Sequence, residues 1–100
     1  MVAASSVELG DRVLVGANAV IVDTDFHPLS PAERRADLSV ARTSPIRIDD
    51  DVFIGMYSLI LKGVHVGAGS VVGAGSVVSR AVPSGVVVAG NPARIVRQVC

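Results

Sequence analysis

The segment IGMYSLILKGVHVGAGSVVGAGSV, residues 54–77, repeats a pattern every six residues. Each of its hexads begins with Ile or Val, and three of the four have glycine at the second position. The same phase runs through residues 48–83 and also through residues 3–26. The ten first positions are Ala3, Leu9, Val15, Ile21, Ile48, Ile54, Ile60, Val66, Val72 and Val78. Nine of these ten are Leu, Ile or Val, which indicates a true structural repeat.

A period of six predicts a parallel β-helix. Each hexad would form one short strand and one tight turn, and three hexads would close one coil of a triangular prism. The aliphatic first residue would point inward and stack on its equivalents in neighbouring coils, while glycines and small residues permit the turns. An α-helix would need an apolar period of 3.6, and a hairpin sheet would alternate with a period of two. We therefore expect an all-β fold of about three coils.

The composition agrees with this fold and excludes several functions. One hundred residues make a single domain, residues 1–100. Half of the residues are hydrophobic but only 3% are aromatic, so small and β-branched side chains must build the core. A formal charge of zero argues against a nucleic-acid-binding surface. The chain has no apolar run as long as a membrane span and no recognisable leader, so we expect a cytoplasmic protein.

A segment without hexads, residues 27–47, interrupts the repeat. We therefore expect this segment to be a loop extruded from one corner of the prism. Long loops on rigid scaffolds commonly carry function. It separates the first coils (residues 1–26) from a second set (residues 48–83), and residues 84–100 form a C-terminal segment. Within the loop, SPAERRADL can begin a short helix. The expected helix start has Ser30 as N-cap, Pro31 at the first position and Glu33 at the third.

Two short motifs carry more specific information than the hexads. One is the pair His27–Pro28 where the hexads give way to the loop, and the other is Gly90-Asn91-Pro92-Ala93-Arg94 near the end. With the hexads between them, they resemble the hexapeptide-repeat acetyltransferases, in the branch of the maltose, galactoside and nodulation-factor O-acetyltransferases. The resemblance implies a left-handed β-helix, a homotrimer, acetyl-coenzyme A as co-substrate and no metal. The acceptor that it implies is a hydroxyl of a sugar or polysaccharide precursor.

The resemblance also assigns roles to individual residues. His27 would be the general base, because a neutral imidazole can take the proton of the acceptor hydroxyl as its oxygen attacks the thioester directly in a ternary complex. Asp25 and Arg34 are candidates to orient the imidazole or to bind the acceptor, although Asp25 could equally cap a turn. The arginines at the C-terminal end suit the phosphates of coenzyme A. The residues assigned to coenzyme A are Met56, Ala74, Ser79, Arg80, Arg94 and Arg97.

Two of the chain's departures from the family keep other functions open. Met56 stands where relatives often carry Ser, Ala or Gly, so only its backbone N–H could bind an oxyanion. Relatives usually have more coils before the equivalent of Val7, and this chain is expected to lack the part of the acceptor site that those coils supply. The alternatives are a serine O-acetyltransferase-like enzyme and a non-catalytic module for assembly or coenzyme A binding. The sequence argues against a third alternative, a zinc-dependent γ-type carbonic anhydrase. That enzyme needs three histidines, and the chain has only His27 and His65.

Overall fold

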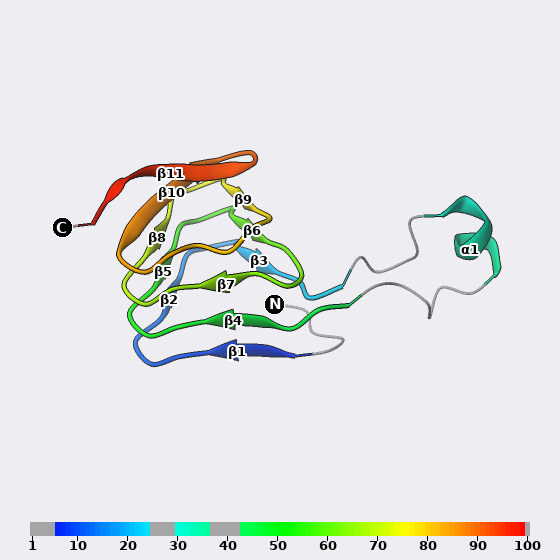
Figure 1. The fold of residues 1–100 in the computed structure, drawn as a ribbon, viewed down its shortest axis with the longest axis horizontal. Helices are drawn as coiled ribbons and strands as arrows, with labels where there is room; N and C mark the ends of the chain where they lie inside the picture. Colours follow the sequence, from blue (N-terminus) through cyan, green and yellow to red (C-terminus); the bar gives the residue numbers. More distant parts are fainter. Residues whose placement is uncertain (1–5, 25–29, 37–42, 100) are drawn as a thin grey trace.

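Three sheets form the faces of a triangular prism (Figure 1). The computed structural model describes residues 6–24, 30–36 and 43–99. The first face consists of β1 (Val7–Leu9), β4 (Ile46–Ile48) and β7 (His65–Val66). The second face consists of β2 (Leu14–Val15), β5 (Phe53–Ile54), β8 (Val71–Val72), β10 (Val86–Gly90) and β11 (Ala93–Gln98). The third face consists of β3 (Val20–Ile21), β6 (Leu59–Ile60) and β9 (Val77–Val78). The fold is an all-β, left-handed parallel β-helix of about three coils with one extruded loop, which confirms the expected fold class.

One turn of the coil takes 18 residues in the regular part of the chain, because Ile48 pairs with Val66 and Ile60 pairs with Val78. Three hexads therefore bring the chain back to the same face, as the period predicts. In the first coil, Leu9 pairs with Ile48, which lies 39 residues further on. The 21 extra residues of that turn belong to the loop.

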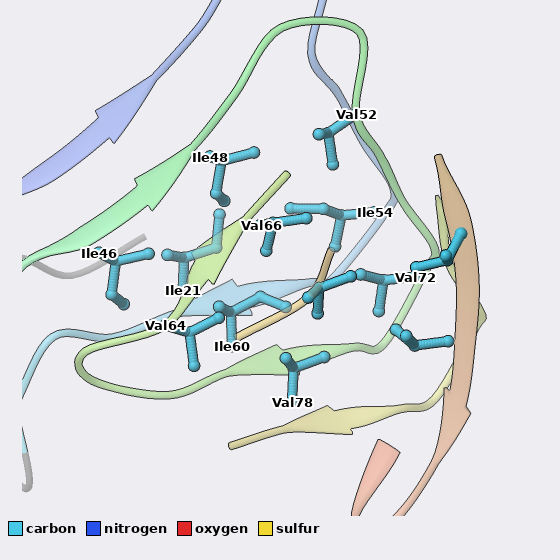
Figure 2. Close-up of a cluster of buried hydrophobic side chains, with 13 residues drawn as sticks. Ile21, Ile46, Ile48, Val52, Ile54, Ile60, Val64, Val66, Val72 and Val78 are labelled. Atoms are coloured by element: carbon cyan, nitrogen blue, oxygen red, sulfur yellow. The ribbon is translucent and has the colours of Figure 1, made fainter. Parts of the chain in front are cut away.

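The core is a column of Ile and Val side chains inside the prism (Figure 2). The first-position residues that are 0–2% exposed are Ile21, Ile48, Ile54, Ile60, Val66, Val72 and Val78. The fifth position also points inward, which the hexad pattern did not predict: Val52 and Val64 are each 1% exposed. The fifth residue of one hexad and the first residue of the next are two positions apart, and residues two apart in extended chain share a face.

Three buried hydroxyls occupy fifth positions in this core, those of Ser58, Ser70 and Ser76. Ser70 Oγ donates to Pro83 O and accepts a hydrogen bond from Val86 N at 3.2 Å. Ser76 Oγ accepts one from Gly90 N, also at 3.2 Å. Because buried polar groups are stable only when they are hydrogen-bonded, the hydroxyls of Ser70 and Ser76 fix the third coil to the part of the chain above it.

The three corners of the prism are each named for one residue. The Asp50 corner comprises residues 10–12, 49–51 and 67–69. The Met56 corner comprises residues 16–18, 55–57 and 73–75. The loop corner comprises residues 22–24, 61–63 and 79–81.

Glycines have two different roles at these corners. At the second hexad position, glycine lets the backbones of adjacent coils touch: a Cβ on Gly55 would lie 2.7 Å from Ala74 N. At the fourth position, glycine adopts the positive φ that the turn requires, as at Gly69 (+72°) and Gly75 (+70°). Non-glycine residues also take this conformation, with φ between 57° and 60° at Arg12, Asn18, Asp51 and Tyr57.

The loop leaves and re-enters the prism at the loop corner, where Thr24 and Thr43 form an antiparallel bridge. The coil resumes at Ile46, earlier than the expected restart at Ile48. The reason is that Ile46 occupies an inward fifth position, and its side chain is 1% exposed. The expected loop boundary at residue 47 is therefore corrected to the residue before Ile46.

The loop contains one helix among the residues that are described, α1 (Pro31–Ala36), which includes Arg34. It begins at Pro31, directly after Ser30, as the sequence predicts. Figure 1 shows α1 standing apart from the prism. No helix in the described ranges is long and apolar enough to cross a membrane.

The two ends of the prism differ. At the C-terminal end, β10 and β11 form an antiparallel hairpin above β8 (Figure 1). The coil is shorter there, because Val72 pairs with Val88 only 16 residues later. At the N-terminal end, no strand of the described part pairs with the outer edges of β1, β2 and β3. The inward residues Leu9 and Val15 are consequently 42% and 45% exposed.

Candidate functional site

The three outer faces of the prism carry different chemistry. The outward residues of the first face are charged or ionisable, and the register stacks them as Glu8, Arg47 and His65. The outward residues of the second face are Leu14, Phe53 and Val71. Those of the third face are Val20, Leu59 and Val77. Leu14 is 65% exposed, Phe53 is 45% exposed and Val20 is 39% exposed, so both of these faces carry exposed apolar side chains in the described part of the chain.

The first face holds a network of charged groups that sequence reasoning missed. Arg47 Nε donates to Asp49 Oδ1 at 2.9 Å, and His65 Nε2 lies 2.8 Å from Asp49 Oδ2. Hydrogen bonds from Arg47 and then His65 hold the pKa of Asp49 below its ordinary value of 3.8. A cavity of about 290 Å³ lies beside this network, with Glu8 and Asp50 in its wall. No group of three metal-binding side chains occurs among the described residues. This face is therefore a solvated surface stabilised by charge pairing.

The Met56 corner brings together two of the residues predicted to bind coenzyme A. Met56 and Ala74 occupy equivalent positions in successive coils, and Gly75 N donates to Met56 O at 2.9 Å. Both residues are exposed, Met56 by 51%. Within the described part of the chain, neither the Met56 N–H nor the Ala74 N–H donates a hydrogen bond. A rigid corner with unengaged N–H groups can stabilise negative charge on a bound molecule.

Arg94 and Arg97 lie on β11, at the C-terminal end of the second face. Arg97 pairs with Val87, and Arg94 pairs with Ala89. Paired residues in antiparallel strands point to the same side, and Val87 and Ala89 alternate with buried residues of β10, so both arginines belong to the outer surface. A Cβ on Gly73 would lie 3.2 Å from Ala89 Cβ, which places the backbone of Arg94 just beyond the Met56 corner.

Ser79 and Arg80 lie at the loop corner, and both are exposed. The same corner contains Asp23, a fully buried carboxylate that the sequence did not single out. Asp23 O also accepts a hydrogen bond from Ser44 N at 2.9 Å, across the base of the loop. The loop corner thus has a fixed backbone from which the loop departs.

The residues predicted to form one site therefore fall into two groups within a single chain. Met56, Ala74, Arg94 and Arg97 follow the Met56 corner and the edge beyond it, whereas Ser79 and Arg80 occupy the loop corner. The third face separates the two corners, because β3, β6 and β9 each run from one corner to the other. His27 and Asp25 lie outside the described residues, and Arg34 lies in α1.

Comparison with known proteins agrees with this architecture. The profile of the bacterial transferase hexapeptide (six repeats) matches residues 45–80, and that of the hexapeptide repeat of succinyl-transferase matches residues 2–22. A galactoside acetyltransferase in complex with coenzyme A has a TM-score of 0.87 and 37% identity, covering 94% of this chain and 46% of that one. A hexapeptide-repeat-containing acetyltransferase of Vibrio cholerae, complexed with acetyl coenzyme A, has a TM-score of 0.83 and 31% identity, covering 100% of this chain and 68% of that one.

A curated relative from Staphylococcus aureus, a 2,3,4,5-tetrahydropyridine-2,6-dicarboxylate N-acetyltransferase, is 42% identical over 89 residues. This match covers 89% of the chain but only 32% of the relative, so the chain spans about a third of the length of the curated relatives that it matches. The identity and coverage of the Vibrio cholerae structure, together with the hexad geometry, show that the chain belongs to the hexapeptide-repeat acetyltransferase family.

Proposed function

We propose that the protein transfers an acetyl group from acetyl-coenzyme A to a hydroxyl of a sugar or polysaccharide precursor. We further propose that it does so as a homotrimer whose sites each draw on two subunits. The observation that carries this proposal is the separation of the predicted site residues into two groups, at opposite edges of an apolar face. A single prism keeps the groups apart, so a second copy is needed to complete a site.

A three-fold assembly would bring the two groups together. If the third faces of three copies surround a common axis, the Met56 corner of each copy meets the loop corner of the next. Such a head-to-tail contact uses two different surfaces and closes into a ring of three. It would also cover the outward side chains of the third face, Val20, Leu59 and Val77, of which Val20 is 39% exposed. The charged first face would remain in water.

Coenzyme A fits the chemistry of the groove that this contact would form. Arg94 and Arg97 of one subunit, with Arg80 of the next, supply cations for its phosphates. The pantetheine arm would follow the corner past Ala74, which has no bulky side chain to block it. The thioester carbonyl would then lie near the Met56 N–H. Both solved relatives described above hold coenzyme A or acetyl coenzyme A, which supports this assignment.

His27 would supply the general base. Its imidazole takes the proton from the acceptor hydroxyl while that oxygen bonds to the thioester carbon. The resulting oxyanion is stabilised by the Met56 N–H, and its collapse breaks the carbon–sulfur bond. The imidazolium returns the proton to the leaving thiolate, so the products are an acetyl ester and coenzyme A with a free thiol. Because acetyl-coenzyme A is a metabolite of the cytoplasm, we expect the enzyme to work there.

An amine acceptor is the second candidate, because the Staphylococcus aureus relative is named as an N-acetyltransferase. The same base and oxyanion site would serve an amine nucleophile. A panel containing sugars, L-serine and amino compounds, with release of free thiol from acetyl-coenzyme A as the readout, decides between them. The substrate that gives the highest kcat/KM identifies the acceptor class.

The proposed function is tested by thiol release in wild type and His27→Ala. We expect acceptor-dependent release in wild type, loss of release in His27→Ala, and unchanged coenzyme A binding by calorimetry in both. Equal turnover in the variant would remove His27 from the mechanism. Absence of coenzyme A binding in wild type would instead favour a non-catalytic module.

A further inference from the structure

Tyr57 places a bulky aromatic side chain at the fourth hexad position, where the turn takes a positive φ. Its φ is +58°, in the left-handed region that a bulky residue enters only with strain. The other three non-glycine residues in this region are Arg12, Asn18 and Asp51, at the same turn position of other hexads. Asparagine tolerates the conformation, as at Asn18, and Arg12 and Asp51 are joined by an ion pair of 2.6 Å. Tyr57 has no side-chain hydrogen bond or ion pair within the described residues, and it is 66% exposed.

The surroundings of Tyr57 make its side chain stand out from the Met56 corner. The equivalent fourth positions in the neighbouring coils are Asn18 and Gly75, and the third positions are Ala17 and Ala74. Tyr57 N donates to Ala17 O at 3.0 Å, which fixes the backbone from which the ring projects. Strained residues of this kind cluster at functional sites, where a contact outside the chain can offset the strain.

The order of residues along the corner indicates what Tyr57 contacts. Tyr57 belongs to the second coil, Ala74 belongs to the third, and Arg94 lies beyond them on β11. The loop that carries His27 follows Thr24 in the first coil. If the phosphates of coenzyme A bind at the arginines, Tyr57 lies toward the other end of the groove, where the thioester meets the acceptor.

We propose that Tyr57 contacts the acyl acceptor and helps to determine acceptor specificity, an inference that rests on the proposed function. A tyrosine side chain combines an apolar ring face with a hydroxyl. This combination matches a sugar, which presents C–H groups on the face of its ring and hydroxyls at its rim. The corner without Tyr57 would offer Asn18, Met56 and small side chains, but no apolar ring face for a sugar to pack against.

Two variants separate this role from a structural one. Tyr57→Asn relieves the backbone strain and removes the ring, whereas Tyr57→Phe keeps both the strain and the ring and removes only the hydroxyl. For Tyr57→Asn we expect the melting temperature to rise by about 4 °C and the acceptor KM to rise about threefold to tenfold. The KM for acetyl-coenzyme A should stay unchanged. Tyr57→Phe should melt like wild type and show a smaller rise in acceptor KM.

The outcomes distinguish failure of this inference from failure of the proposed function. If wild type transfers acetyl groups and Tyr57→Asn leaves the acceptor KM unchanged for every active acceptor, the inference about Tyr57 is wrong and the proposed function stands. If Tyr57→Asn instead dissociates the assembly, as measured by mass in solution, Tyr57 is a subunit contact and the inference is also wrong. If wild type acetylates no acceptor, the proposed function fails and the role of Tyr57 fails with it.

Discussion

The backbone of Met56 rests directly on Gly16 in the coil below: a Cβ on Gly16 would lie 2.5 Å from Met56 N and 2.9 Å from Met56 Cα. Any side chain at position 16 must therefore push the Met56 corner away from the first coil. Gly16→Ala is expected to lower the free energy of unfolding by about 2–3 kcal/mol, a typical effect of overpacking. It should also reduce acetyl transfer, and urea unfolding with thiol-release assays measures both.

Gly69→Ala is the matched control for this prediction. A Cβ on Gly69 would meet nothing within 4 Å, but the residue has a φ of +72°. Its substitution should therefore cost only the conformational strain, about 1 kcal/mol, and it should leave transfer intact. Equal losses of stability in the two variants would contradict the close approach at Gly16.

Ser70 provides a second test of how the coils are held together. Ser70→Ala removes the hydroxyl that donates to Pro83 O and accepts from Val86 N. Two backbone groups then lose a partner, and we expect the free energy of unfolding to fall by about 1–3 kcal/mol. Ser58→Ala should cost less, because the acceptor of Ser58, Gly73 O, keeps its hydrogen bond from Ser76 Oγ. A larger loss in Ser58→Ala, measured by urea unfolding, would show that this account of the hydroxyls is wrong.

The charged network of the first face predicts a dependence of stability on pH. The folded state lowers the pKa of Asp49 below its ordinary value of 3.8, so the folded state binds this proton less tightly than the unfolded state. The stabilisation is therefore present above pH 3.8 and is lost as the pH falls through the lower, folded-state value. Asp49→Asn should be less stable than wild type at neutral pH, with the difference shrinking in acid. Melting temperatures of both proteins across this range would contradict the account if the difference stayed constant.

The sequence predicted the fold in detail because its repeat leaves little freedom. Aliphatic first positions such as Ile54 and Val72 are fully buried, as expected. The sequence did not reveal that the fifth position also faces inward, since the serines there, such as Ser70, look like surface residues until their backbone partners are known. It also did not reveal the positive φ of Tyr57, because residues as different as glycine and tyrosine occupy the fourth position and no shared residue type marks the turn.

The candidate site was less predictable than the fold. The residues assigned to coenzyme A came from a resemblance, and the structure shows that Met56 and Arg80 lie at different corners. A period of six places each residue on a coil of the prism but says nothing about how separate subunits assemble. The network of Arg47, Asp49 and His65 escaped notice because His65 belongs to the next coil, 16 residues after Asp49, and the sequence pattern alone does not show that the two side chains meet.

The arginines of β11 predict a measurable loss of cofactor affinity. Arg94→Ala and Arg97→Ala should each weaken coenzyme A binding by about tenfold, because hydrogen bonds to charged groups are strong. The loss should shrink at high salt, which screens the phosphates. Arg12→Ala removes the same charge from the Asp50 corner, away from the proposed groove, and serves as the control. Calorimetry that finds equal affinities for all three variants would contradict the assignment of β11.

The most direct test of a site shared between subunits is complementation in mixed trimers. His27→Ala lacks the base on the loop, and Ala74→Trp blocks the groove at the Met56 corner, so each variant alone should be inactive. Ala68→Trp, at the equivalent turn position of the Asp50 corner, is the control for the tolerance of a bulky side chain and should remain active. When the two inactive variants are co-expressed in equal amounts, about a quarter of the sites receive an intact corner and an intact loop from neighbouring subunits. The account predicts recovery of acetyl transfer to about that fraction, and the absence of any recovery in verified mixed trimers would contradict it.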